Sequence, residues 1–459
     1  MQGVPSVQLV EKYLSIPVAP GNSGLIEHLA KALTFRLSDD EIPVRLVIAA
    51  IDDDSYLCEV GCLVGDNIPR LRDPQSIFSL RRRNGESAEQ FTTIFVVPTG
   101  IGAEVGGHAG DATPAAQLLA SCCDRLITHP NVVNASDVNE MPANALYVEG
   151  SVLCRLLMGT VGLAPVRSNR LAVVFDTQPD AMLENLVLNT VESARTTYGL
   201  DCAGIYKLDP PLELTALWSE SGRAVGRGRR LEGLFDLIAE KADEFDAVAI
   251  SSLIGVPDGY HEEYFRSDGA MINPWGGIEA MLTHAVSHVF DVPSAHAPMM
   301  ESREILNEDP GRVDPRMAAE AISSSFLQCV LKGLKQSPRL VVDPELMLAS
   351  GVLSARDVSC LIIPEGCIGL PTLAALEQGI PVIAVREGAG LIAHELKSLP
   401  WRPHQLFVAE NYWEAAGILS ALRTSIAPQS VRRPFARLEP KSWKIPDQPK
   451  SGSGLKQNS

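Results

Sequence analysis

The sequence predicts an α/β fold in which mostly parallel sheets are covered by helices on both faces. Segments with strand and helix patterns alternate along most of the chain, and this alternation is typical of parallel sheets. Two expected strands, 171–175 (LAVVF) and 247–250 (AVAI), are continuously apolar, as expected of strands buried on both sides. Ligands bind such sheets at the carboxyl ends of the strands, so we expect a site in the loops there.

The expected elements cover most of the chain, after a small N-terminal α/β layer with a helix at 23–37 and a strand at 44–51. The expected strands are 92–97, 145–149, 170–176, 203–208, 246–253, 359–363 and 381–385. The expected helices are 114–124, 181–198, 231–243, 274–289, 315–335, 371–378 and 412–424.

Four regions are expected from the linkers and from changes in composition. A polar segment, 80–87 (LRRRNGES), reads as a linker, and the last residues are rich in proline, lysine, serine and glycine. We expect an N-terminal α/β appendage (1–88), an α/β domain with a glycine-rich loop (89–300), a second α/β domain or a continuation of the first (301–436), and a disordered tail (437–459).

Composition narrows the class of protein. The 459 residues carry a net charge of −17, which argues against nucleic acid and anionic membranes as main partners. No apolar run approaches the roughly 20 residues that span a bilayer, and the N-terminus shows no targeting pattern. Nine cysteines without a regular spacing fit reduced thiols. We therefore expect a cytoplasmic protein.

A glycine-rich segment, 91–114 (FTTIFVVPTGIGAEVGGHAGDATP), joins an apolar strand to the start of a helix. This arrangement is a common way to hold an anion. It lacks the dinucleotide fingerprint, because Val105 occupies the sixth position, and it lacks the Gly-Lys-Ser/Thr of a P-loop. The alternative is a tight turn before a packed helix. We expect His108 to be a catalytic candidate and the ligand contacts to be Thr99, Gly100, Gly102, Glu104, Gly106, Gly107 and Asp111.

A second candidate turn holds Cys367, in 360–372 (CLIIPEGCIGLPT). The thiol follows an apolar strand and precedes a helix that Pro371 can open, and a helix N-terminus lowers a thiol pKa. Cys367 is therefore a candidate catalytic residue, with Gly366, Gly369 and Thr372 as ligand contacts. The alternative is a small residue required by a tight turn.

Two further polar segments add candidates. His129 and Asn131 follow a strand-like segment, 125–127, and we expect them to act as a catalytic group and a ligand contact. Arg223 belongs to SGRAVGRGRR, a segment expected to be a flexible basic loop. It could clamp a carboxylate or phosphate, whereas a solvated surface loop is the alternative.

Three histidines suggest a metal ion. His284 and His288 lie four residues apart on an expected helix, and His296 follows shortly, so three imidazoles could bind a divalent transition metal with Glu279 or Asp291 as a fourth group. No cofactor is identified otherwise. The alternative is that these histidines pack or cap the end of the helix.

Two family resemblances add expectations. Residues 359–385 resemble the cysteine loop of aspartate/glutamate racemases, maleate isomerases and arylmalonate decarboxylases; racemases of that group need a second cysteine, whereas Cys122 and Cys123 fall in an expected helix. The whole span 91–437 resembles the domain-of-unknown-function 3326 family of cyanobacterial and plant genomes. The motifs are PTGIGAEVGGHAGDATP, THPNVVNASDVNEMPANALYVEGS, NPWGGIEAMLTHAVS, SAHAP, DPRMAAEA and IIPEGCIGLPTLAALEQGIPVIAV. That resemblance implies a cytosolic or plastid enzyme-like protein and no particular reaction.

Three functions from different classes remain open. The first is an enzyme acting on a small anionic metabolite, a carboxylate, by cysteine and histidine proton transfer, as an isomerase, racemase or decarboxylase. The second is a metal-assisted hydrolase or lyase built on His284, His288 and His296. The third is a non-catalytic nucleotide or metabolite sensor. Several polar turns at strand ends favour an enzyme, and acidic α/β proteins of this size often form homo-oligomers.

Overall fold

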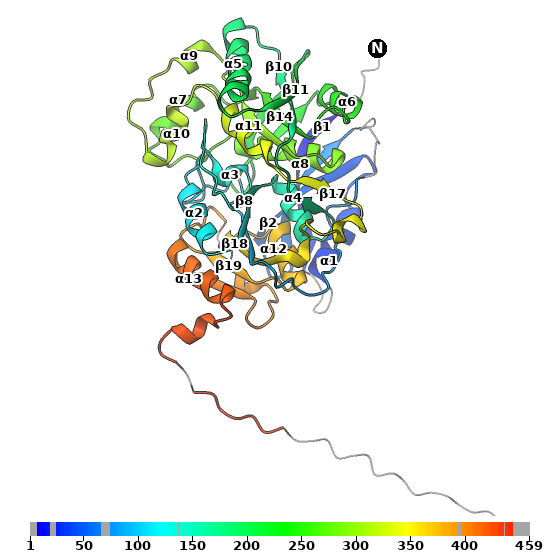
Figure 1. The fold of residues 1–459 in the computed structure, drawn as a ribbon, viewed down its shortest axis with the longest axis vertical. Coiled ribbons are helices and arrows are strands. Elements are labelled where there is room, and N and C mark those ends of the chain that lie inside the picture. Colours follow the sequence, from blue (N-terminus) through cyan, green and yellow to red (C-terminus); the bar gives the residue numbers. More distant parts are fainter. Residues whose placement is uncertain are drawn as a thin grey trace, which may run out of the picture.

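The α/β fold class is confirmed by a computed structural model, which describes residues 7–18, 24–65, 74–135, 137–392, 394, 396–435 and 437–443. Two parallel sheets and one mixed sheet account for most of the strands of this part of the chain. Figure 1 shows β10, β11 and β14 with helix α5 at one end of the molecule and β18, β19, α12 and α13 at the other.

The first sheet has six parallel strands. Their order across the sheet is β8 (Ala145–Tyr147), β5 (Arg125–Thr128), β4 (Thr92–Phe95), β18 (Val358–Pro364), β19 (Val382–Val385) and β20 (Leu406–Ala409). Numbered along the chain this order is 3-2-1-4-5-6, the order of doubly wound sheets that bind dinucleotides. The winding reverses between β4 and β18, which pair directly at Ile94 and Leu361. The glycine-rich loop after β4 and the Cys367 turn after β18 therefore leave the same edge side by side.

Helices cover both faces of this sheet. They are α1 (Leu25–Thr34), α2 (Thr113–Ser121), α3 (Pro130–Val133), α4 (Gly150–Leu157), α12 (Leu370–Gln378) and α13 (Tyr412–Arg423). Helix α12 packs against α4 and α1, and α13 packs against α2. All seven residues of β18 are buried, as in strands that are covered on both faces of a sheet.

The second sheet has four parallel strands in the order β11 (Asp201–Leu208), β10 (Arg170–Asp176), β14 (Ala247–Ser252) and β16 (Ser294–Pro298). Its main helices are α5 (Ala181–Thr197), α6 (Glu232–Glu240), α8 (Gly276–Phe290) and α11 (Leu327–Lys335). This sheet lies within the chain between β8 and β18. The first sheet, which is parallel, consequently combines strands from both sides of the domain boundary expected near residue 300.

The third sheet is mixed and brings the N-terminal segment to the middle of the chain. Its order is β15 (Ile254–Gly255), β12 (Glu213–Trp218), β13 (Ala224–Arg229), β1 (Gln8–Pro17), β3 (Ser55–Val64) and β2 (Glu41–Ile51). Strand β1 is antiparallel to both β3 and β13. The N-terminal α/β layer thus shares one sheet with residues expected to lie in the next domain.

Two expectations about local structure are wrong. The basic segment after Arg223 is strand β13 rather than a flexible loop, because Arg227 and Arg229 alternate with buried glycines. The helix expected at 315–335 is broken into a 3₁₀ turn (Pro315–Met317), α10 (Ala318–Ala321) and α11. A run of serines interrupts it: Ser323 Oγ donates to the carbonyl of Ala319, and Ser325 Oγ accepts from the backbone N–H of Leu327.

The remaining elements are short. They are β6 (Asn134–Ala135), β7 (Val138–Asn139), β9 (Gly162–Ala164), β17 (Arg339–Val341), α7 (Tyr260–Arg266), α9 (Arg303–Leu306) and 3₁₀ turns at Leu346–Leu348, Ala355–Asp357, Leu396–Ser398 and Pro428–Val431. Among the described helices, none combines the length and apolar composition that a membrane crossing requires. Of the expected disordered tail (437–459), residues 444–459 lie outside the described residues.

The contact between α8 and β13 gives a test of the fold. A Cβ on Gly277 would lie 2.3 Å from the carbonyl oxygen of Ala224, so Gly277→Ala should lower the free energy of unfolding by roughly 1–3 kcal/mol. Gly417→Ala is the matched control, because a Cβ on Gly417 in α13 would meet no atom of the described residues outside its own helix within 4 Å, and the substitution should gain up to about 1 kcal/mol from helix propensity. Urea denaturation measures both. Equal effects of the two substitutions would contradict the packing.

Candidate active site

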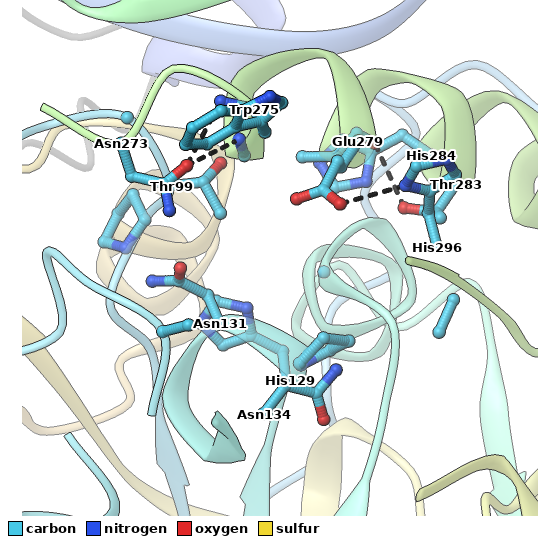
Figure 2. A pocket seen from close by; sticks show the side chains of 18 of the residues that line it. Thr99, His129, Asn131, Asn134, Asn273, Trp275, Glu279, Thr283, His284 and His296 are labelled. Atoms are coloured by element: carbon cyan, nitrogen blue, oxygen red, sulfur yellow. Dashed lines mark hydrogen bonds and ion pairs between the residues drawn. The ribbon is translucent and has the colours of Figure 1, made fainter. Parts of the chain in front are cut away.

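A cavity of about 280 Å³ lies at the carboxyl edge of the first sheet, the parallel one with six strands. Its walls include the segments after β4 and β5, the first turns of α4 and α12, helix α8, and β16 of the second sheet. Figure 2 shows Glu279 and His284 from α8 on one side, with His129, Asn131 and Asn134 opposite them. The loops that follow predicted strands therefore meet at one site, as parallel sheets generally arrange them.

The first histidine–carboxylate pair on the cavity wall is His284 with Glu149. His284 Nδ1 is hydrogen-bonded to Glu149 Oε1, and the same oxygen accepts from the hydroxyl of Thr283 at 3.2 Å. The other oxygen, Oε2, accepts from the backbone N–H groups of Ser151 and Val152, at 2.8 and 3.2 Å, and from the hydroxyl of Ser151. Glu149 is thus the N-cap of α4 and also the partner of a histidine on α8.

The surroundings of Glu149 keep it ionised. Burial raises the pKa of the Glu149 carboxyl, but the charge of His284 and the donors on His284, Ser151 and Val152 outweigh burial, so its pKa is lowered overall. An ionised carboxylate only accepts hydrogen bonds, so His284 must donate from Nδ1. Nε2 is then the ring nitrogen left to act on a ligand in the cavity, which His284 lines.

The second pair on the cavity wall is Glu279 with His296. His296 Nδ1 lies 2.9 Å from Glu279 Oε1, and His296 Nε2 lies 2.7 Å from the hydroxyl of Ser252 at the end of β14. Both ring nitrogens are therefore engaged. The Glu279 side chain is 24 % exposed whereas that of His296 is 1 % exposed. In the hydrogen-bonded series Ser252–His296–Glu279, the Glu279 carboxylate is therefore the terminal group that is open to the cavity.

Ser252, His296 and Glu279 are connected in the atom order of a serine-hydrolase triad. Ser252, however, is fully buried and does not lie on the cavity wall. Its hydroxyl therefore orients the imidazole and is not placed to attack a ligand.

His129 also faces the cavity, as the N-cap of α3. The backbone N–H of Val97 donates to its Nε2 at 3.1 Å, which leaves the proton of the neutral ring on Nδ1. Burial lowers the pKa of His129 to about 4, with the nearby Glu149 opposing this change. His129 is therefore a neutral hydrogen-bond donor at physiological pH.

The glycine-rich loop contributes less to the wall than the sequence suggested. Thr99, Gly100 and Gly107 line the cavity, and Asn131 lines it while its amide nitrogen holds the loop at the carbonyls of Val97 and Gly106, at 2.9 and 3.0 Å. Gly106 adopts φ +94° and packs on the Val97 side chain, which requires glycine. The candidates Gly102, Glu104 and Asp111 are not among the described lining residues.

His108 takes part in a buried network behind this wall. Its Nδ1 lies 2.8 Å from the Tyr264 hydroxyl, and burial followed by the charge of Arg316 lowers the pKa of His108. Glu320, which does line the cavity, accepts from the backbone N–H of Ala109 at 2.6 Å and from the amide of Asn273 at 3.2 Å. Burial raises the pKa of Glu320 to about 7 and that of Asp111 to about 6.

The Cys367 turn reaches the correct edge of the sheet, but its thiol does not face the cavity. Cys367 is buried and is absent from the described lining residues, whereas Gly369 is among them. Burial raises the pKa of Cys367 to about 12, only partly opposed by the charge of Arg223. Thr372 donates its hydroxyl to the Cys367 carbonyl at 2.7 Å, and Gly366 packs against the Ile392 backbone. Burial therefore outweighs the effect of the helix N-terminus.

The three histidines considered for a metal ion do not form one cluster. His284 and His296 bond different glutamates, and His288 is buried with no hydrogen-bond partner among the described residues at either ring nitrogen. Within the part of the chain that the structure describes, no group of three or more histidine, cysteine, aspartate or glutamate residues is arranged to hold a metal. Arg223 does line the cavity, bonded to Glu59 rather than exposed on a loop.

Two functional candidates, Glu149 and Ser252, were missed in the sequence. Glu149 ends the expected strand 145–149 and precedes Gly-Ser, but glutamate is not among the residues preferred at a helix N-cap, so the sequence carries no sign of its capping role. Nothing in the sequence links it to His284, which lies 135 residues away. Ser252 also ends an apolar strand. Its hydrogen-bond partner, His296, lies on the adjacent strand β16, and the sequence alone does not show that these two strands pair.

Buried His288 gives a prediction for stability against pH. Burial and then the charge of Arg155 lower its pKa from 6.5 to about 3, so between these values the unfolded chain binds a proton that the folded chain does not. Stability from this group is complete above pH 6.5 and declines as the pH falls. His288→Leu should therefore reduce the loss of unfolding free energy between pH 7 and 5 by about 2 kcal/mol.

Urea denaturation at pH 7 and pH 5 measures this difference. His404→Asn is the control, because His404 is exposed and has a positive φ, which asparagine tolerates. The same pH dependence in His288→Leu as in the unsubstituted protein would refute the assignment.

Comparisons with known proteins place the chain in a family without an assigned activity. Residues 92–432 match the family model described as "Protein of unknown function (DUF3326)". An uncharacterised lipoprotein of Synechococcus sp. is 34 % identical over 349 residues, which are 74 % of this chain and 93 % of that protein. No solved structure matches the chain. The chain belongs to the DUF3326 family of proteins of unknown function.

Proposed function

We propose that this protein is an enzyme that transfers protons on a small polar metabolite, as an isomerase or lyase, with His284 and Glu279 as the two reacting groups. One observation carries the proposal. A histidine and a glutamate from one helix line a single cavity at the carboxyl edge of a parallel sheet, and each is hydrogen-bonded to a buried partner.

His284 has the arrangement of a general acid or base. Its Nδ1–H is fixed by an ionised carboxylate, so its Nε2 is presented to the cavity in a defined tautomer. The same carboxylate stabilises the imidazolium that forms when Nε2 takes a proton. Gly150 leaves room for the ring, since a Cβ there would lie 2.9 Å from His284 Cε1.

Glu279 supplies the second group. The bond from His296 occupies Oε1, so Oε2 is the oxygen available to a ligand. An isomerisation or elimination needs one group that removes a proton and one that returns or donates it. His129, a neutral donor on the opposite wall, is placed to bond a substrate oxygen.

The size of the cavity supports a small substrate. A volume of about 280 Å³ lies just below the usual range of ligand sites, roughly 300–1,000 Å³. The strand order is that of dinucleotide-binding sheets, yet the glycine-rich loop lacks their fingerprint at Val105. We therefore favour a compact metabolite over a dinucleotide, and histidine and glutamate over the cysteine of the local racemase resemblance.

Deuterium exchange tests this proposal without a known substrate. The protein is incubated in D2O with pools of small hydroxy, oxo and unsaturated carboxylates, and ¹H NMR follows loss of carbon-bound protons. We expect exchange into at least one compound, and His284→Gln or Glu279→Gln should slow it by about 10²-fold or more. His404→Asn, an exposed histidine variant, should exchange at the original rate.

Two outcomes would contradict the proposal. Exchange that persists unchanged in both site variants would exclude His284 and Glu279 as the reacting groups. A compound that binds the protein without any exchange or turnover would instead support a metabolite-binding sensor.

A further inference from the structure

One end of the cavity is lined by two buried arginines from the mixed sheet. Arg45 on β2 is 8 % exposed and Arg223, directly before β13, is 2 % exposed. Burial, followed by the positive charge of Arg45, lowers the pKa of Arg223. The two guanidinium groups are therefore close enough to repel each other.

Each arginine has a carboxylate partner that uses only part of its guanidinium. Arg45 Nη2 donates to Glu11 Oε2 at 2.7 Å, and Arg223 Nη1 donates to Glu59 Oε2. These glutamates compensate the charge, so both arginines can stay ionised in the interior.

The Nε atoms of both arginines are buried without an acceptor within the described residues. Buried N–H donors are nearly always paired in folded proteins. Two unpaired donors on arginines that both line one cavity show that the described residues leave this part of the wall incompletely hydrogen-bonded.

The first turn of α12 lies at the same end of the cavity. Gly369, Leu370 and Pro371 line it, and the nine-residue helix has Gly369 as its N-cap with no side-chain cap. Strand β2 meets this turn through a bridge between Val47 and Gly369. Arg45 lies two residues from this bridge on β2, and both arginines line the same cavity as the turn, so guanidinium groups and a helix N-terminus converge.

We propose that this end of the cavity binds an anionic group of the ligand, a carboxylate or a phosphate, between Arg45, Arg223 and the N-terminus of α12. The inference rests on the proposed function, for which it supplies the substrate anchor. Guanidinium forks and helix N-termini are the two standard protein partners of such groups. The position, beside the point where the sheet reverses its winding, is where doubly wound sheets bind ligands.

Titration calorimetry with inorganic phosphate and with malonate tests the site. The double variant Arg223→Met/Glu59→Gln removes the ion pair without leaving a buried charge, and it should weaken anion binding at least tenfold. Lys12→Met/Glu41→Gln is the matched control, because it removes another ion pair between strands of the same sheet away from the described lining residues. The control should bind as the unsubstituted protein does.

Selective binding identifies the group: phosphate alone indicates a phosphorylated ligand, and malonate alone indicates a carboxylate. Arg45→Lys serves as a second variant that keeps the charge beside Glu11 but lacks the Nε–H, and it should also weaken binding. No binding of either anion, or equal binding in the arginine variants, would overturn the inference. His284→Gln should still bind the anion, so loss of exchange with retained binding would separate failure of the chemistry from failure of the anchor.

Discussion

The buried carboxylate of Glu149 is the interaction on which the proposed site depends. It follows β8 by two residues, caps α4, and joins α4 to α8 through Thr283 and His284. Because its two oxygens accept five hydrogen bonds in all, the carboxylate stays charged despite burial. The same charge that stabilises the junction between the six-stranded sheet and the inserted α/β region also fixes the tautomer of His284. The packing of this junction and the proposed reactivity of His284 thus both depend on the Glu149 side chain.

The chain topology explains why such a junction exists. The second parallel sheet is inserted between the third and fourth strands of the first, so its helix α8 and strand β16 close over the carboxyl edge of the first sheet. The mixed sheet adds the third wall, since β2 comes from the N-terminal segment and β13 from the middle of the chain. Arg45, Glu11 and Glu59 lie in this sheet and Arg223 directly precedes β13, and such buried ion pairs cost desolvation and gain only from well-made bonds. Their unpaired Nε atoms make sense if the wall is completed by a ligand.

The parallel strands and the principal helices were predictable because their sequence patterns are local. Residues 170–176 were expected as a strand and form one with the same limits, while α5 and α13 end within one residue of expectation. The edge that carries the site also followed from local patterns, since His129 and the Gly369 turn come directly after strands. The pairing of His284 with Glu149 and of His296 with Glu279 could not follow, because it depends on how an insertion packs over a sheet. Cys367 illustrates the opposite case. Its position just before a helix favours a thiolate, but burial, which depends on how the chain packs, raises the pKa of its thiol.

The tautomer of His284 tests the account most directly. Long-range ¹H–¹⁵N NMR of the imidazole rings, assigned with His284→Gln, reports which nitrogen carries the proton. We predict that the neutral ring carries its proton on Nδ1 and that this preference is lost in Glu149→Gln. A neutral ring protonated at Nε2, or a tautomer unchanged by Glu149→Gln, would contradict the role of Glu149 in presenting His284 to the cavity.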